Sequence, residues 1–158
     1  HIHHYGIVHR DIKPSNILFT ANGVPKLADL GLAKLMLSVS KRRRLRQAEA
    51  GIGTPPYLAP EQVDPSAYGD VDWRADIWQL GVVLYEALTG QNPFMAPTPA
   101  EVTGRILAHQ PKPPSKLRSE VPQELDEIIL MALKKHKDER YQSAAEMKRD
   151  LLAALDTL

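Results

Sequence analysis

The chain has 158 residues, 43% hydrophobic and 25% charged, which is the composition of one soluble globular domain. Its 20 basic and 19 acidic residues give a formal net charge of +1, so bulk charge gives no reason to expect a nucleic-acid or membrane partner. The absence of cysteine excludes disulfides, zinc–thiolate sites and a cysteine nucleophile, and it is compatible with a reducing cytoplasm.

Near the start of the chain, two short apolar-rich runs, residues 16–20 and 24–28, are separated by Ala21-Asn22-Gly23. An Asn-Gly pair between two such runs predicts a β-hairpin. Because a hairpin returns on itself, this one is expected to bring Asn16 and Asp29 together at its open end.

Residues 32–53 show no clean period and are predicted to form a long mobile loop. After this loop helices dominate. The first is expected to be capped by Asp72, to run to about Thr89 and to stop at Gly90. Its most apolar part, residues 77–88, is interrupted by two polar side chains and is too short to cross a bilayer, so it is interpreted as a buried core helix. No secretory signal is visible, and we expect a cytoplasmic domain without a membrane segment.

Three further helices are predicted towards the end of the chain. A short one lies near residues 100–109, and an amphipathic one begins at Pro122. Ser143-Ala144-Ala145-Glu146 has the form of a capping box. It opens a last helix with three apolar residues on one face: Met147, Leu151 and Leu155. No internal repeat and no second domain are visible.

Three motifs follow one another in this order: His9-Arg10-Asp11-Ile12-Lys13-Pro14-Ser15-Asn16, Asp29-Leu30-Gly31 and Ala59-Pro60-Glu61. In order and spacing they resemble the eukaryotic-type protein kinase family, most of all its bacterial serine/threonine members. The resemblance extends over nearly all 158 residues. It implies ATP and Mg²⁺ as cofactors and transfer of the ATP γ-phosphoryl group to Ser or Thr hydroxyls of a protein substrate.

The resemblance also implies the fold. We expect residues 1–158 to form a mainly α-helical structure, the C-terminal lobe of a protein kinase domain, with a small β-hairpin at its catalytic edge. Motifs that the family places earlier are not found in this chain: a glycine-rich G-x-G-x-x-G loop, a V-A-I-K strand and the helix that carries the partner Glu. The N-terminal lobe is therefore expected as a missing partner in the full protein.

Within the resemblance, Asp11 is the residue that orients the substrate hydroxyl and accepts its proton. Lys13 matches the lysine that serine/threonine kinases use against the transferred phosphate, and Thr54 matches a threonine whose hydroxyl bridges that Asp and Lys. Outside such a motif, an isolated Asp after an Arg is more often a surface ion pair, and an isolated Lys is usually solvated.

Asn16 and Asp29 match the Mg²⁺ ligands of the family, and their side-chain oxygens suit that ion. The plain alternative is that both residues cap turns. Leu18 matches the apolar floor beneath adenine, although core packing is equally compatible with it. Leu30 replaces the more frequent Phe of the Mg²⁺ motif, an apolar-for-apolar change.

Two pairings are expected to support the site. Asp76 matches an aspartate that accepts hydrogen bonds from the backbone around His9 and Arg10, and the alternative is an acid in a first helical turn stabilised by the helix dipole. Glu61 matches a glutamate that pairs with an arginine between the last two helices, here Arg140.

Many relatives are activated when a phosphorylated loop residue pairs with the arginine at the position of Arg10. At the usual loop position this chain has no hydroxyl, and we hypothesise that Glu49 supplies the charge permanently. Ser38, Ser40 and Thr54 are alternative phosphorylation sites. The adjacent basic run, residues 41–46, has a specific acidic partner or nucleic acid as one interpretation and simple solvation as the other.

His1, His3 and His4 lack a nearby Cys, Asp or Glu to complete a metal site, and they are interpreted as structural. One functional alternative stays open, a non-catalytic kinase lobe or pseudokinase fragment that docks partners through its helical face. Without the other lobe, adenine has only a floor and the phosphates lack a lid, so the isolated chain is expected to be inactive.

Overall fold

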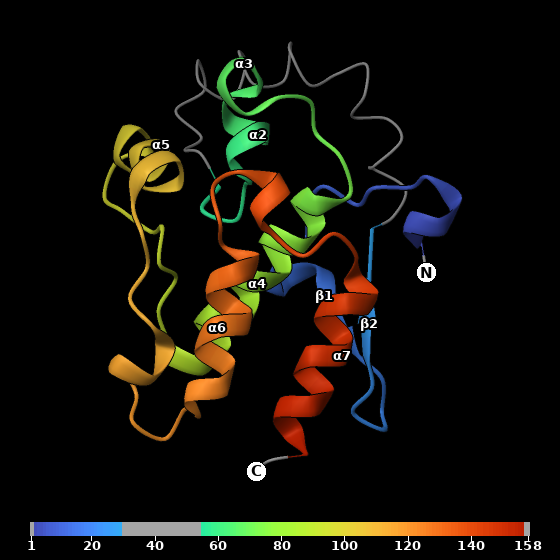
Figure 1. Ribbon diagram of the computed structural model, residues 1–158. Coiled ribbons are helices and arrows are strands. Elements are labelled where there is room, and N and C mark those ends of the chain that lie inside the picture. Colours follow the sequence, from blue (N-terminus) through green and yellow to red (C-terminus); the bar gives the residue numbers. More distant parts are fainter. Residues whose placement is uncertain (1, 30–54, 157–158) are drawn as a thin grey trace.

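The structure, a computed structural model, describes residues 2–29 and 55–156, and this part is mainly helical with one two-stranded sheet (Figure 1). The α-helices are α2 (Pro60–Val63), α3 (Pro65–Tyr68), α4 (Arg74–Thr89), α5 (Pro99–Ala108), α6 (Gln123–Ala132) and α7 (Ala144–Leu155). Short 3-10 turns are η1 (Ile2–Tyr5), η2 (Pro14–Asn16), η3 (Pro114–Lys116) and η4 (Lys137–Glu139). The sheet pairs β1 (Ile17–Phe19) with β2 (Pro25–Leu27). The predicted combination of helices with a small hairpin is confirmed.

The hairpin forms where the Asn-Gly pair predicts it, although its strands are shorter than expected. β1 and β2 run antiparallel, with Leu18 opposite Lys26. Gly23 in the turn has a φ of 74°, a left-handed conformation that glycine adopts without steric cost. The Ala28 amide donates a hydrogen bond of 2.8 Å to the Asn16 carbonyl. Pairing therefore continues to the open end of the hairpin, as predicted.

α4 lies at the centre of the molecule, and α6 packs across it (Figure 1). It ends at Gly90, whose φ is 73°, as predicted. Its start differs from the prediction, because Trp73 occupies the N-cap position and Asp72 does not. The Asp72 carboxylate instead accepts a hydrogen bond of 2.9 Å from the Arg74 amide, in the turn that precedes the helix. Within the described ranges, every helix falls short of the length or apolar character that a membrane crossing requires.

Two apolar clusters form the core around α4. The larger one contains Trp78 and Phe94, whose rings stack with centroids 5.1 Å apart and an interplanar angle of 16°. Buried Ile106 from α5 and Ile129 from α6 pack into the same cluster. The smaller cluster joins α4, α6 and α7 and includes Met147 from α7. α4 is therefore covered by helices from the second half of the chain.

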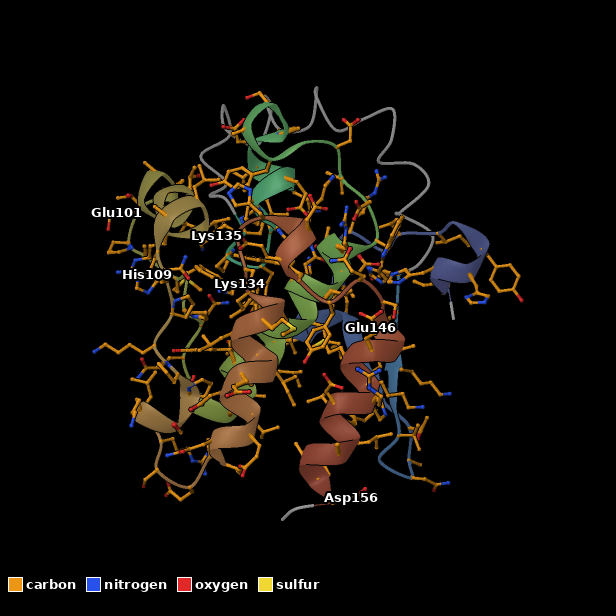
Figure 2. All side chains as sticks on the ribbon, viewed as in Figure 1. Glu101, His109, Lys134, Lys135, Glu146 and Asp156 are labelled. Atoms are coloured by element: carbon orange, nitrogen blue, oxygen red, sulfur yellow. The ribbon has the colours of Figure 1, made fainter. Side chains whose placement is uncertain are left out.

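The start of α7, where Figure 2 labels Glu146, follows the predicted capping only in part. Ser143 Oγ accepts a hydrogen bond of 3.2 Å from the Glu146 amide, as a capping box requires. The reciprocal bond is different, since the Glu146 carboxylate accepts from the Gln142 amide at 2.9 Å. Leu155, predicted to share a face with Met147, is 58% exposed, whereas Ala154 is buried in the cluster that contains Met147.

Gly81 allows α4 and α6 to approach closely. A Cβ atom at this position would lie 2.9 Å from Ala132 Cβ and 3.2 Å from Leu133 Cδ2. We expect Gly81→Ala to lower the free energy of unfolding by about 1–3 kcal/mol, because the added methyl group overpacks the contact. Urea unfolding followed by circular dichroism measures this change.

Gly104 in α5 provides the matched control. A Cβ added there meets no atom of the described structure within 4 Å. We expect Gly104→Ala to raise the free energy of unfolding by about 0.5–1 kcal/mol, because alanine loses less conformational freedom in a helix than glycine does. If the two variants were equally stable, close packing at Gly81 would be disproved.

Candidate active site

The main chain at Arg10, directly before Asp11, adopts an uncommon conformation. Its φ is 67°, which is sterically costly for a residue with a side chain. The Asp76 carboxylate holds it from one side: Oδ1 accepts from the Arg10 amide at 2.8 Å and Oδ2 accepts from the His9 amide at 2.9 Å. These are the hydrogen bonds predicted for Asp76, and they give a carboxylate that is only 3% exposed the partners it needs.

Two buried glutamines hold the same segment from the other side. The Arg10 carbonyl accepts hydrogen bonds of 2.9 Å from both Gln62 Nε2 and Gln79 Nε2. Gln79 Oε1 accepts from the Ile12 amide at 2.8 Å, and Gln79 Nε2 also donates to Gln62 Oε1. α2 and α4 thus fix the peptide groups on both sides of Arg10. The sequence reasoning missed both glutamines, although Gln79 interrupts the most apolar run of the chain.

His9 connects this segment to the hairpin. Its ring is 2% exposed, and Nε2 lies 2.8 Å from the Ala28 carbonyl, to which it can only donate. Nδ1 therefore accepts the hydrogen bond of 3.3 Å from the Asp11 amide. The imidazole thus ties the main chain at Asp11 to the end of the hairpin, one residue before Asp29.

His3 is placed by the same aspartate, because its Nε2 lies 2.8 Å from Asp76 Oδ2. This contact agrees with the structural interpretation of His3, while His1 lies outside the described residues. Among residues 2–29 and 55–156, no group of three or more His, Cys, Asp or Glu side chains is arranged to hold a metal ion.

Asp11 forms a compact polar group with Lys13 and Asn16. Lys13 Nζ lies 2.9 Å from Asp11 Oδ2, and Asn16 Nδ2 donates to the same oxygen at 3.1 Å and to the Asp11 carbonyl at 2.7 Å. The Asp11 side chain is 28% exposed. Within the described part of the chain, its Oδ1 accepts no hydrogen bond. One carboxylate oxygen is therefore held by its neighbours, while the other can accept a proton donor from solution.

Asn16 and Asp29 lie at the open end of the hairpin, as predicted. Asn16 is 6% exposed, and its amide nitrogen faces Asp11, which leaves Oδ1 as a free acceptor among the described atoms. Asp29 follows the strand pair directly and has a φ of 63°, a left-handed conformation that Asp tolerates better than most residues. The hairpin thus places two oxygen-bearing residues at the same end, one before β1 and one after β2, with Asp11 beside Asn16.

Leu18, in β1, is 57% exposed. The alternative that it belongs to the core is therefore wrong. Its neighbour Phe19 is 69% exposed as well, so the hairpin presents apolar side chains to its surroundings. An exposed apolar strand beside the polar group of Asp11 is compatible with a surface that receives a flat ring, the role that the resemblance gives Leu18.

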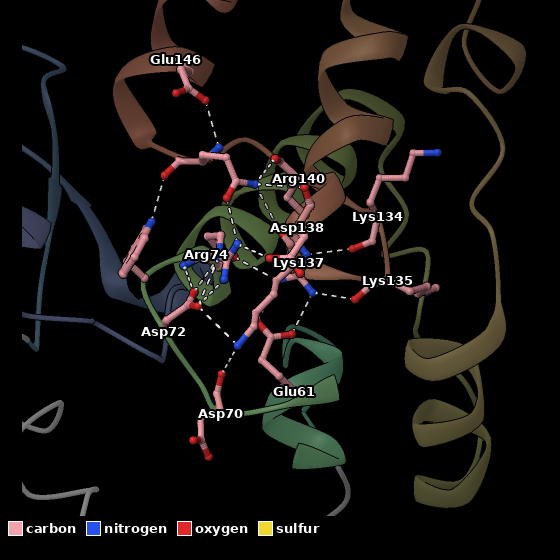
Figure 3. A network of polar contacts seen from close by, with 12 residues as sticks. Glu61, Asp70, Asp72, Arg74, Lys134, Lys135, Lys137, Asp138, Arg140 and Glu146 are labelled. Carbon is pink, nitrogen blue, oxygen red and sulfur yellow. Dashed lines mark hydrogen bonds and ion pairs between the residues drawn. The ribbon is translucent and has the colours of Figure 1, made fainter. Parts of the chain in front are cut away.

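Glu61 and Arg140 form the predicted pair, which Figure 3 shows at the centre of a larger network. Arg140 Nη1 and Nη2 each donate at 2.7 Å to one oxygen of the Glu61 carboxylate, and both side chains are 0% exposed. The guanidinium also donates to the carbonyls of Arg74, Lys134 and Lys135. A fork of this kind satisfies every donor of the arginine and joins α2 to the segment between α6 and α7.

A second polar group beside this pair was not predicted. Arg74 donates to both oxygens of Asp72, to Asp138 at 2.6 Å and to Gln142 at 2.8 Å (Figure 3). Lys137 Nζ lies 3.4 Å from Asp72 Oδ2. Burial alone would raise the pKa of Asp72, but hydrogen bonds and charge from Arg74, with the Lys137 charge, lower it below its ordinary value. The start of α4 is thus fastened to η4 by charged groups.

Several predicted features lie outside the described residues. They are Thr54, Leu30, Ser38, Ser40, Glu49 and the basic run 41–46.

Comparisons with known proteins agree with the motifs. Residues 1–152 match the family model described as protein kinase domain. The chain is 44% identical over 151 residues to serine/threonine-protein kinase PknB of Mycolicibacterium smegmatis, covering 95% of this chain and 23% of that protein. It is 44% identical over 155 residues to a probable serine/threonine-protein kinase of Streptomyces coelicolor, and 37% identical over 149 residues to one of Clostridium perfringens. These matches cover 98% and 94% of the chain, and 22% and 21% of the relatives.

The chain thus spans less than a quarter of the length of the curated relatives it matches. The predicted fold class, a mainly helical C-terminal lobe with a small hairpin, is confirmed by the family match and the observed elements together. The chain therefore belongs to the protein kinase domain family.

Proposed function

We propose that this chain is the C-terminal lobe of a serine/threonine protein kinase, and that it transfers the γ-phosphoryl group of ATP to protein Ser or Thr hydroxyls once its N-terminal lobe is present. The observation that carries the proposal is the group around Asp11. Lys13 and Asn16 occupy one oxygen of its carboxylate, and the other oxygen remains an acceptor. A substrate hydroxyl that donates to this oxygen would be oriented, and its proton would have a base within reach.

Asn16 and Asp29 are the residues we propose for Mg²⁺. Asn16 Oδ1 has no donor among the described atoms, and hard oxygen ligands of this kind suit that ion. When bound, Mg²⁺ would neutralise charge on the phosphates. Two protein ligands are few, which fits an ion that keeps several waters and binds substrate phosphates as well. The exposed Leu18 supports a place for adenine on β1.

Lys13 supplies the positive charge. Its ammonium lies 2.9 Å from Asp11 Oδ2 and is partly open to solvent, so it can approach an anionic group without losing its partner. Thr54 remains the proposed bridge between these two residues. The names of the relatives support Ser and Thr as substrates, since each is called a serine/threonine-protein kinase.

The proposal is tested with two purified proteins, the 158-residue chain alone and the same chain joined to an upstream kinase lobe. Both are incubated with γ-labelled ATP, Mg²⁺ and a general protein substrate. We expect label on phosphoserine and phosphothreonine with the joined protein, and no substantial transfer by the chain alone, because its nucleotide would have a floor but no lid.

Two outcomes would contradict this proposal separately. If the 158-residue chain alone transferred phosphate, and Asp11→Asn abolished this activity, the N-terminal lobe would not be required. A joined protein that is folded and binds ATP but transfers nothing would favour the alternative, a non-catalytic lobe that serves as a binding module.

A further inference from the structure

Lys135, directly after α6 and Leu133-Lys134, is a buried lysine that neither the motifs nor the proposed reaction uses. Its side chain is 8% exposed, whereas Lys134 beside it is exposed. Figure 3 shows the Lys135 side chain pointing away from the charged network. A lysine with so little access to water needs specific partners.

Its first partner is the end of α5. Lys135 Nζ donates to the Ile106 carbonyl at 2.8 Å and lies 3.4 Å from the Arg105 carbonyl. Both carbonyls belong to the last turn of α5, where main-chain acceptors run short of donors inside the helix; the Arg105 carbonyl also accepts from the His109 amide at 2.9 Å. The amine thus caps α5 from another part of the chain, and a cation there also has the sign that the helix dipole favours.

Its second partner is the aromatic pair at the centre of the core. Lys135 Nζ lies 4.8 Å from the centroid of the Trp78 ring and 4.5 Å from that of Phe94. The Arg140 guanidinium carbon lies 5.1 Å from the Trp78 centroid as well. Arg140 Nη2 donates to the Lys135 carbonyl at 2.9 Å. The main chain of Lys135 therefore helps to hold the guanidinium that pairs with Glu61.

The charges around Lys135 are unbalanced. The Arg140 charge acts on it from its own segment, the His109 ring at the end of α5 is close enough to interact with its charge, and Glu61 from α2 is already paired with Arg140. α4 and the loop after it contribute the uncharged rings of Trp78 and Phe94. Burial, with a smaller contribution from the Arg140 charge, lowers the pKa of Lys135 from 10.5 to about 7. The rings and the carbonyls favour the charged amine and therefore oppose this shift.

We propose that Lys135 is a positioning residue that holds the last turn of α5 against the Trp78–Phe94 stack, and that acidification weakens this hold. As a neutral amine, Lys135 donates to the Ile106 carbonyl and is buried at low cost. As an ammonium, it is buried next to a cation and gains by moving towards water. The proposal concerns the packing of this chain and does not depend on phosphoryl transfer.

The sign of the pH effect follows from proton binding. An unfolded chain keeps Lys135 protonated up to its ordinary pKa, whereas the folded chain releases that proton near pH 7. The unfolding equilibrium constant should therefore fall as the pH rises between these values, by up to about tenfold per pH unit. Lys135→Met has no such proton, so its unfolding equilibrium constant should lack the part of the pH dependence that comes from Lys135.

The first experiment measures urea unfolding of the full chain from about pH 6 to pH 9 for wild type, Lys135→Met and the exposed control Lys134→Met. We expect the ratio of wild-type to Lys135→Met unfolding constants to fall by more than about tenfold over this range, and the ratio for the control to stay constant. If the wild-type and Lys135→Met constants changed in parallel, Lys135 would keep one charge state and the proposal would be wrong.

The second experiment keeps the test decisive if Lys135→Met does not fold. In a Trp73→Phe background, Trp78 is the remaining one of the two tryptophans, and its fluorescence reports on the amine beside it. We expect a fluorescence transition with a midpoint at about pH 7, unchanged in a further His109→Gln variant. A transition that His109→Gln removes, or no transition at all, would contradict the proposal.

Discussion

Asp11→Asn in the chain joined to its N-terminal lobe should lower the rate of phosphoryl transfer by about 10²- to 10⁴-fold, the usual contribution of a general base. An amide keeps the size of the side chain and one acceptor for Lys13 or Asn16, but it cannot take a proton from the substrate hydroxyl. The measurement is transfer of labelled phosphate at saturating ATP, which separates the chemical step from nucleotide binding.

Asp156→Asn is a suitable control, because this exposed acid near the end of α7 lies outside the site. We expect its rate to equal that of the wild type. The affinity for Mg²⁺-ATP should also change little in Asp11→Asn, since we assign the metal to Asn16 and Asp29. A rate for folded Asp11→Asn that matched the control would show that Asp11 is not the base.

The part of this site that the sequence predicts is the part that local physics determines. The Asn-Gly turn fixes the hairpin within a few residues, and the hairpin in turn brings Asn16 and Asp29 to one end. Asn16 is five positions from Asp11, so their contact is also nearly local. Gly90 ends α4 for a similar reason, because few residues other than glycine accept its φ of 73°.

Partners far apart in the sequence were predicted only where the family resemblance supplied them. Asp76 contacts a main chain 66 and 67 positions away, and Glu61 pairs with Arg140 over 79 positions. Gln62 and Gln79 act over similar separations, but a glutamine has no single preferred partner that a sequence could reveal. The one available signal was Gln79 within an apolar run, since a polar side chain there has to find a buried partner.

Lys135 was missed for a different reason. In the sequence it is the second of two adjacent lysines, and lysines are rarely buried. The α6 pattern places Leu133 on the buried side, but it does not show that the chain after the helix turns inward. Only the arrangement of α4, α5 and α6 puts an aromatic pair and two helix-end carbonyls around one of the two amines.

Arg140→Ala should lower the free energy of unfolding of the chain by about 3–5 kcal/mol, which would be the largest stability loss among the substitutions considered. The change leaves the Glu61 carboxylate buried without its partner, and it removes the guanidinium that lies over the Trp78 ring beside Lys135. It also leaves the carbonyls of Lys134 and Lys135 without a donor. Urea unfolding measures the loss, and in the joined protein the rate of phosphoryl transfer should fall as well, because α2 directly follows the segment that carries Thr54.

Two comparisons show whether the loss comes from burial. Arg149→Ala removes an arginine that also forms an ion pair, with Nε 2.9 Å from Asp150 Oδ1, but the Arg149 side chain is 72% exposed. We expect a change of less than about 1 kcal/mol there, because water screens a surface pair. The double variant Glu61→Leu with Arg140→Met should be more stable than Arg140→Ala, since it leaves no charge unpaired. If Arg140→Ala were no less stable than Arg149→Ala, the Glu61–Arg140 pair would not hold α2 in place. α2 would then be held by Gln62, which donates a hydrogen bond to the Arg10 carbonyl.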